Sequence, residues 1–346
     1  MFKRYMLFLI VTFQSSLQCT TPTFENTIVS VNDNEETING CISPDILKFK
    51  GEINKISAIN QHILDLNEGA VQNIPTKLEI VFTANNIEII KEDAFFNLTG
   101  LERIDLSENK INWVSENSFT NLPSLTQVNL RSNAVGMTPR AFNNLPELSE
   151  VNFSENNLES FDQNWFYRTP KLRWLWFRNN RLRSIPKAAF IKLPSIVQLH
   201  FETNQIEHID KDAFKGLRNL QRIYFAQNRL KNFEINFHTP SKLVYMGVQF
   251  NNITYISDKV LESIQPNLLK FWVTGNPWQC ACFDNLINWG IKNRIEIAFM
   301  CVQHESVCVY PKTNSTECIE RSDDDFYNEF WKNFGSEWIC TPGRDY

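Results

Sequence analysis

Apolar positions recur along most of the chain at a fixed spacing. Segments such as "LERIDLSENKI" and "LRWLWFRNNRL" share the pattern LxxLxLxxNxL. Its third to sixth residues alternate between variable and apolar positions, which is the period of a short β-strand with one buried face. Successive segments begin 23–25 residues apart, so each is one coil of a repeat array. Ten strand segments are predicted, beginning at Ile53, Lys77, Leu101, Leu125, Leu148, Leu172, Ile196, Leu220, Leu243 and Leu268.

The ninth position of the pattern is an amide in every repeat. A buried amide can bond both backbone donors and acceptors where the chain turns away from the strand, which leucine cannot do. These residues are Gln61, Asn85, Asn109, Asn133, Asn156, Asn180, Asn204, Asn228, Asn251 and Asn276. A phenylalanine later in the repeat predicts an apolar layer on the opposite, convex side. It is found at Phe95, Phe119, Phe142, Phe166, Phe190 and Phe214.

This pattern resembles the extracellular leucine-rich repeat family over about residues 53–278. The resemblance implies an α/β solenoid, a leucine-rich repeat horseshoe of about ten 23–25-residue repeats with a parallel concave β-sheet. The segment "GNPWQCACFDNLINW", with Cys301, Cys308 and Cys318, resembles the disulfide C-terminal cap of such proteins. Stacked repeats need caps because a terminal repeat leaves its apolar face open. We expect an N-terminal cap at 20–52, repeats at 53–275, a cysteine-rich cap at 276–319 and an acidic, aromatic tail at 320–346.

The N-terminus predicts secretion. Lys3 and Arg4 precede the apolar run 5–13, which is too short to span a bilayer and fits a signal peptide at 1–19, cleaved after Cys19. No later window approaches twenty apolar residues, so no membrane anchor is predicted. The expected location is extracellular.

The cysteines predict a disulfide framework in this oxidising compartment. If Cys19 leaves with the signal peptide, Cys41 lacks a partner and is the candidate for a bond to another chain. A free buried thiol and a Cys19–Cys41 pair are the alternatives. A zinc site at the Cys-x-Cys pair is a further, minor alternative. The predicted disulfide cysteines, whose pairing stays open, are Cys280, Cys282, Cys301, Cys308, Cys318 and Cys340.

No pattern in the sequence predicts catalysis. It contains no glycine-rich phosphate loop, HExxH or GxSxG motif, so no enzyme activity, cofactor or metal is expected. His200 and Glu202 share an outward strand face and are expected to form an exposed hydrogen-bonded pair without a nucleophile beside them.

The outward strand positions, which the repeat does not dictate, change character along the chain. They are polar in the first half, and from Leu172 onward they carry aromatic and basic residues. The rings are expected to expose about 500 Å², an area typical of functional patches. Trp, Tyr and Arg are frequent binding anchors. The predicted partner-binding residues are Arg173, Trp174, Trp176, Arg178, His200, Arg222, Tyr224, Tyr245 and Trp272.

Charge marks the same region. Residues 163–201 contain eight Lys and Arg residues and no Asp or Glu, in a chain of net charge −5. Such an island attracts anionic partners, of which a protein or glycoconjugate is expected here and a nucleic acid is not. Packing of the aromatic patch on itself, or cover by the tail, is the alternative. A short amphipathic helix is expected in that tail around Phe330.

Four Asn-x-Ser/Thr sequons predict N-glycosylation, at Asn97, Asn152, Asn252 and Asn314. Asn152 is set apart because it lies on the outward strand face beside Trp176. A glycan there would either stack over the tryptophan or fence the patch off from the N-terminal half.

Similar proteins, including Toll-like receptor ectodomains and invertebrate leucine-rich immune proteins, work in innate immunity. The resemblance therefore implies a secreted, non-enzymatic binding protein that recognises a protein or glycoconjugate through its concave face. Two alternatives stay open. One is a soluble receptor decoy, such as a venom or salivary effector. The other is a matrix or adhesion protein acting as a disulfide-linked homo- or heterodimer.

Overall fold

The computed structural model describes Cys19, residues 21–237 and 242–298, Cys308 and residues 316–319. Within this part of the chain, neither α-helix has the length and apolar character that crossing a bilayer requires. Several predictions concern residues outside the described ranges. They are the apolar part of the signal peptide, Cys301, Cys340, the Asn314 sequon and the tail at 320–346.

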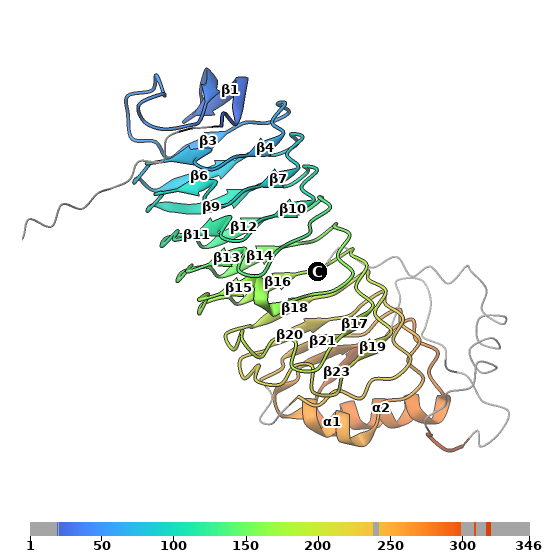
Figure 1. The fold of residues 1–346 in the computed structure, drawn as a ribbon. Helices are drawn as coiled ribbons and strands as arrows, with labels where there is room; N and C mark the ends of the chain where they lie inside the picture. The colour runs from blue at the N-terminus through green and yellow to red at the C-terminus, as the bar shows by residue number, and fades with distance from the viewer. Residues whose placement is uncertain (1–18, 20, 238–241, 299–307, 309–315, 320–346) are drawn as a thin grey trace, which may run out of the picture.

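Every predicted repeat contributes one strand to a single 13-stranded sheet, so the solenoid prediction is confirmed (Figure 1). The strands from β3 to β23 are parallel, and neighbouring coils pair in register. The N-terminal pair β1–β2 is antiparallel. In spatial order the strands are β2 (Asn34–Gly40), β1 (Phe24–Val31), β3 (Lys55–Ser57), β6 (Leu78–Val81), β9 (Leu101–Asp105), β12 (Gln127–Asn129), β14 (Glu150–Asn152), β16 (Trp174–Trp176), β18 (Gln198–His200), β20 (Arg222–Tyr224), β21 (Tyr245–Gly247), β22 (Lys270–Trp272) and β23 (Glu296–Ala298).

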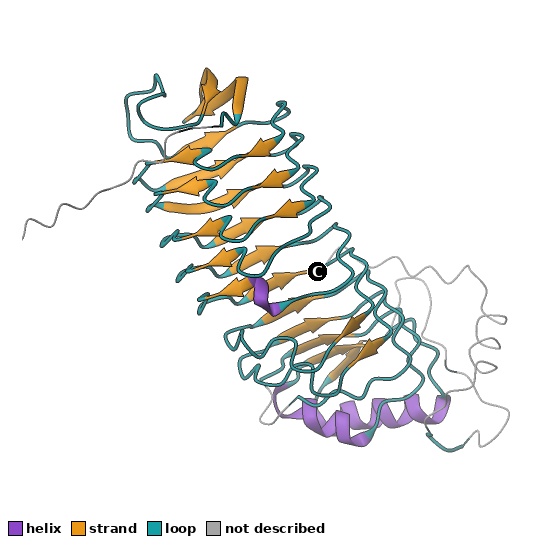
Figure 2. Cartoon of the chain, in the orientation of Figure 1, coloured by secondary structure: helices purple, strands orange, loops and turns teal. Residues whose placement is uncertain are grey.

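The convex side of the described coils consists of turns and short parallel strands. Two-residue strands from successive coils pair into small sheets, and helix appears mainly at the C-terminal end (Figure 2). These strands are β4 (Asp65–Leu66), β5 (Val71–Gln72), β7 (Ile89–Ile90), β8 (Phe95–Phe96), β10 (Trp113–Val114), β11 (Phe119–Thr120), β13 (Phe142–Asn143), β15 (Phe166–Tyr167), β17 (Ser184–Ile185) and β19 (His208–Ile209). The helices are η1 (Gln163–Trp165), α1 (Asp258–Ile264), η2 (Gln265–Asn267) and α2 (Cys280–Asn293).

The core lies between these two sides. The alternating apolar strand residues are buried, as Ile104 and Leu175 illustrate. The predicted phenylalanines stack below the convex surface in two runs, Phe95 to Phe166 and Phe190 to Phe214, and Phe161 contacts both Phe166 and Phe190. Phe142 lies between Phe119 and Phe166, with ring centroids 4.9 and 5.0 Å away. Both predicted apolar layers are therefore present.

The amide ladder satisfies the backbone between coils. Asn180 accepts a hydrogen bond from the Leu158 amide at 3.0 Å and donates to the carbonyls of Phe153 and Phe177 at 2.8 and 3.1 Å. Most other asparagines of the ladder repeat this geometry. Gln61 differs, because its side-chain oxygen accepts from the Ile28 amide of β1. In the first coil the amide therefore ties the repeats to the N-terminal cap.

That cap is a β-hairpin, which the repeat pattern does not predict. Asn32 and Asp33, at the turn between β1 and β2, have φ of 47° and 64°, as the tight turns of hairpins require. Residues 24, 29 and 31 of β1 are buried against the first coil. The hairpin thus covers the apolar end of the solenoid.

Cys41 is bonded to Cys19, so the prediction that it bonds to another chain is wrong in this structure. The two residues are brought together because Cys41 directly follows β2, beside the start of the cap. The pairing is incompatible with signal cleavage after Cys19.

The Cys19–Cys41 pair predicts a particular result on a non-reducing gel. The purified protein should run as a monomer, with Cys19 retained in its N-terminal sequence. Cys41→Ser should also run as a monomer and should gain one thiol reactive to maleimide, that of Cys19. A dimer band in the wild type that disappears in Cys41→Ser would contradict this pairing.

The C-terminal cap is held by two disulfides, Cys280–Cys308 and Cys282–Cys318. Both sulfurs of the Cys-x-Cys pair are thus bonded to cysteines further along the chain, so neither is a zinc ligand. The indole of Trp278, 1 % exposed, donates to the Val273 carbonyl at 3.0 Å. Helix α2 and strand β23 close the end of the sheet.

Candidate functional site

The outward side chains of strands β16 to β22 form a ladder of rings on the concave face, the side of the main sheet opposite the core. The rings of Trp176 and His200 stack with centroids 3.9 Å apart and planes 14° from parallel. Tyr224 continues the ladder 4.8 Å from His200. Each ring stands at the same position of its strand, because the parallel register aligns Trp176, His200 and Tyr224.

A glycine interrupts this ladder at the next coil. Gly247 lies between Tyr224 and Trp272 in the register. A Cβ at Gly247 would stand 2.6 Å from Oε1 of Gln249 and 3.2 Å from Cδ1 of Tyr224. The missing side chain lets Trp272 approach Tyr224, with ring centroids 6.0 Å apart.

A second row of side chains lies on the concave face two residues earlier in the strands, at Trp174, Arg222, Tyr245 and Lys270, and contacts Arg173 and Trp272. It contains three cation–π pairs, in which the cation lies about 5 Å from the ring centre, within the attractive range. Arg173 lies 4.8 Å from Trp174, Arg222 lies 5.1 Å from Tyr245, and Lys270 lies 5.1 Å from Trp272. We call Arg173, Trp174, Arg222, Tyr245, Lys270 and Trp272 the cation–aromatic row.

The rings of the predicted patch are less open than the sequence suggested. Trp174, Trp176, Tyr224, Tyr245 and Trp272 are all partly buried, because each packs on a neighbouring ring or cation. The predicted arginines, Arg173, Arg178 and Arg222, are exposed. The patch therefore consists of arginines projecting above a self-packed aromatic layer.

The prediction of an exposed His200–Glu202 pair is wrong in its exposure. Nδ1 of His200 and Oε1 of Glu202 are 3.0 Å apart, and their side chains are only 11 % and 14 % exposed. The burial follows from the ring ladder, since Trp176 and Tyr224 cover His200 from both sides. Within the described chain, Oε2 of Glu202 and Nε1 of Trp176 are buried without a hydrogen-bond partner.

A groove runs across the concave face beside the ladder, and we call it the central groove. Its cavity volume is about 550 Å³, within the range of pockets that hold drug-sized ligands. Its walls are Arg131, Asn152, Ser154, Glu155, Trp176, Arg178, Gln198, His200, Glu202, Arg222, Tyr224 and Trp272. Six of these residues were predicted from the sequence alone as partner-binding: Trp176, Arg178, His200, Arg222, Tyr224 and Trp272.

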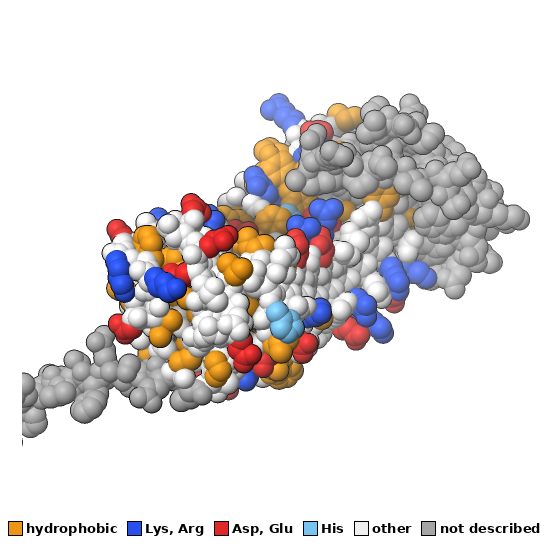
Figure 3. Space-filling view, turned by 90° about the horizontal axis from the view of Figure 1, so that it is seen from above, with side chains coloured by type: hydrophobic (Ala, Val, Ile, Leu, Met, Phe, Trp, Pro, Cys, Tyr) orange, Lys and Arg blue, Asp and Glu red, His pale blue; other side chains and the backbone are white. Residues whose placement is uncertain are grey.

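Charges of both signs line this groove. Arg131 and Glu155 form an ion pair at 2.8 Å, and Ser132 also donates to Glu155. The hydrogen bond from Arg131 holds the pKa of Glu155 below its usual value. Figure 3 shows the same mixture of acidic and basic side chains over the molecular surface seen from above. The basic island of the sequence is thus interrupted in space by carboxylates from other coils.

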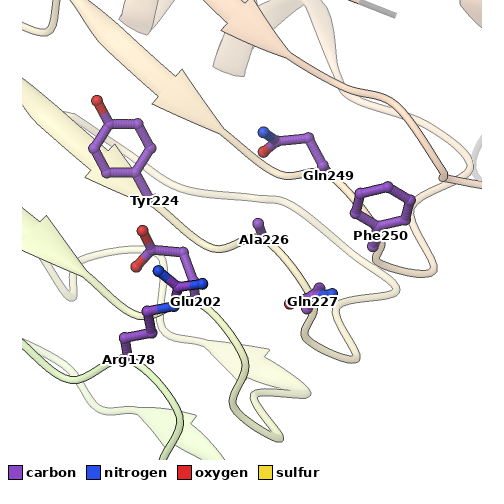
Figure 4. A pocket seen from close by; sticks show the side chains of 7 residues that line it. All are labelled: Arg178, Glu202, Tyr224, Ala226, Gln227, Gln249 and Phe250. Carbon is purple, nitrogen blue, oxygen red and sulfur yellow. The ribbon is translucent and has the colours of Figure 1, made fainter. Parts of the chain in front are cut away.

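A smaller pocket adjoins the groove on its C-terminal side (Figure 4). Arg178 and Glu202 reach it from adjacent coils, and Tyr224, Gln249 and Phe250 form its other walls. Arg178 and Tyr224 were predicted from the sequence as partner-binding, whereas the other residues that line this pocket were not.

The repeat geometry agrees with known family patterns. The family model described as a BspA-type leucine-rich repeat region matches residues 65–181 in six copies. A second model, described as a leucine-rich repeat, matches residues 177–230 and 197–253. Together they cover residues 65–253, more than half of the 346-residue chain. The chain is a leucine-rich repeat protein.

Solved structures place this leucine-rich repeat protein among receptor-like ectodomains in fold. The TLR13–ssRNA13 complex matches with a TM-score of 0.54 and 23% identity over 60% of this chain and 30% of that chain. A chain of the octameric complex of Latrophilin 3, Unc5D and FLRT2 gives a TM-score of 0.56 and 18% identity over 79% of this chain and 93% of that chain. The LRIM1/APL1C complex gives a TM-score of 0.58 and 19% identity over 85% of this chain and 55% of that chain.

The leucine-rich repeat protein thus spans less than a third of the matched TLR13 chain and about half of the LRIM1/APL1C chain. At these identities the likeness concerns the fold alone. Among curated proteins, no sequence matches this chain significantly.

Proposed function

We propose that this leucine-rich repeat protein is a secreted, non-enzymatic recognition protein that binds a protein partner through the C-terminal half of its concave face. The observation that carries the proposal is the cation–aromatic row. It places arginine and aromatic side chains, the residue types that most often anchor protein interfaces, at adjacent positions on a rigid sheet.

The charge of the row indicates which partner surfaces fit it. Arg173 and Arg222 are exposed, and neither forms an ion pair among the described residues. Their guanidinium groups are held over rings rather than by carboxylates. A partner segment bearing Asp or Glu could therefore pair with both without displacing an internal partner.

The wider role we propose is extracellular recognition in innate immunity. It is supported by the resemblance to Toll-like receptor ectodomains and by the likeness in fold to the TLR13 and LRIM1/APL1C structures, which are complexes. Disulfides in both caps are compatible with an extracellular location. The alternative of a dimer linked through Cys41 loses its basis, since that cysteine is already bonded within the chain.

The test is capture of a partner from the extracellular fluid of the source organism by the immobilised protein. Trp174→Ala combined with Arg222→Ala should weaken binding of the captured protein at least about 30-fold, or about 2 kcal/mol. Binding by the wild type should also fall as salt is raised, because ion pairs are screened.

Matched substitutions elsewhere provide the control. Arg103 occupies in β9 the position that Arg222 occupies in β20 and is equally exposed, and Trp113 is 46% exposed on the convex side. Trp113→Ala with Arg103→Ala should leave binding unchanged. Equal losses in both double variants would place the interface elsewhere.

A further inference from the structure

The central groove lies over a glycosylation sequon. Asn152, Phe153 and Ser154 form the sequence Asn-x-Ser, and Asn152 and Ser154 both line the groove. Phe153 between them is fully buried in the core. Asn152 stands directly beside Trp176, because β14 and β16 pair in that register. The described sequons at Asn97 and Asn252 lie outside the strands of the main sheet.

The side-chain nitrogen of Asn152 is not engaged by the described part of the protein. Oδ1 of Asn152 accepts a hydrogen bond from the Ser154 amide at 2.9 Å, which orients the side chain. Toward the described residues, Nδ2 donates no hydrogen bond. Asn129, at the same position of the preceding strand, donates from Nδ2 to Asp105 at 3.1 Å. Nδ2, the atom to which a glycan is attached, is therefore available at Asn152, whereas the Nδ2 of Asn129 is already hydrogen-bonded.

Trp176 is partly exposed and lines the groove on the same side. His200 from β18 covers one face of the indole at 3.9 Å. On the other side, the neighbouring strand presents the short side chain of Asn152, followed by Ser154, in place of a ring. Adjacent strands are about 4.8 Å apart, so this apolar face lies within reach of the first sugar of an Asn152 glycan.

The other walls favour a neutral ligand rich in hydroxyl groups. The Arg131–Glu155 ion pair borders one side of the central groove, and Arg178 borders the other. Three arginines and two glutamates line the groove in all, so its walls offer both guanidinium donors and carboxylate acceptors. Hydroxyl groups both donate and accept hydrogen bonds, so a sugar can bond guanidinium and carboxylate alike. The volume of about 550 Å³ suits a ligand of the size of a short oligosaccharide.

We propose that Asn152 carries an N-linked glycan whose first sugars lie in the central groove against Trp176. In the attachment, Nδ2 forms a bond to C1 of the first sugar of a lipid-pyrophosphate-linked oligosaccharide. The bond from C1 to the pyrophosphate breaks, the lipid pyrophosphate leaves, and the amide proton passes to a base of the transferase. The glycan is the occupant that the groove holds in the secreted protein.

This assignment divides the concave face. The glycan fills the groove next to Trp176, which Arg222 and Trp272 also line, whereas Arg173, Trp174, Tyr245 and Lys270 of the cation–aromatic row lie outside the groove. Partner binding is then confined to the C-terminal half, with the glycan as its border. The inference does not depend on the identity of a partner, and its test requires none.

The test compares the solvent accessibility of Trp176 in protein secreted from eukaryotic cells, with and without the Asn152 glycan. Mass spectrometry of the wild type should find Asn152 occupied. Hydroxyl-radical footprinting should show Trp176 protected. Removing the glycan by Asn152→Gln or by Ser154→Ala should raise oxidation of Trp176 severalfold, while Trp113 on the convex side serves as the internal reference.

Two further measurements separate the effect of losing the glycan from an effect of the substitution on folding. Asn97→Gln removes a sequon from an exposed turn and should leave oxidation of Trp176 unchanged. Treatment of the folded wild type with peptide N-glycosidase removes the glycan after folding and should likewise raise oxidation of Trp176. An unoccupied Asn152, or an occupied Asn152 whose removal leaves Trp176 oxidation unchanged, would overturn the proposal. Unchanged partner capture in the Trp174→Ala, Arg222→Ala variant would instead refute only the proposed function.

Discussion

Replacing Asn180 with alanine should lower the free energy of unfolding by at least about 3 kcal/mol, because it leaves buried backbone groups without partners. The side chain is 6% exposed and bonds the Leu158 amide and the carbonyls of Phe153 and Phe177. These groups belong to two adjacent coils, so the loss loosens the contact between repeats. Urea denaturation followed by circular dichroism and by tryptophan fluorescence measures it.

The control for this substitution is Asn112→Ala. Asn112 is exposed, and its side chain makes no hydrogen bond among the described residues. Its replacement should change the free energy of unfolding by less than about 0.5 kcal/mol. If Asn180→Ala proved as mild as Asn112→Ala, the amide ladder would not be what joins the coils.

Replacing Phe142 with alanine should cost about 4 kcal/mol, since it deletes a buried ring and leaves a cavity that rigid neighbours cannot fill. Phe142 is 0% exposed and stacks between Phe119 and Phe166 at 4.9 and 5.0 Å. Because its neighbours in the stack belong to the coils before and after it, the cavity opens in the middle of the convex layer. The same denaturation measurement applies.

Tyr167→Ala provides the comparison for Phe142. Tyr167 follows Phe166 in β15 and is 42% exposed. Among the described residues, the groups that lie over its ring are the guanidinium groups of Arg140 and Arg168. Its removal should cost about 1 kcal/mol or less, the value of exposed cation–π contacts. Equal costs for the two variants would show that the phenylalanine stack adds nothing beyond surface packing.

Much of the fold could be predicted from the chain alone. The pattern LxxLxLxxNxL locates ten strands and the amide ladder, because a short strand with one buried face requires period-two alternation and a buried turn requires an amide. The end elements could not be predicted in this way. The hairpin β1–β2 and strand β23 lie outside the repeat pattern, and only the structure shows that they pair with the first and last coils.

The candidate site was predicted in its residues but not in its arrangement. Trp176, His200 and Tyr224 were identified because the repeat leaves their positions unspecified. That they stack on one another and bury His200 follows only from the register of three strands. The role of Lys270 was missed, although it occupies the same strand position as Arg222 and lies over Trp272.

The sequence by itself determined the solenoid, its period and the identity of the side chains on its concave face, because these depend on local alternation within each repeat. The tertiary structure decided which of those side chains meet. It placed Arg131 and Glu155 beside the basic island, joined Cys19 to Cys41, and set the side chain of Asn152 beside Trp176. These contacts join residues about 24 apart, and they exist only once successive coils stack in register.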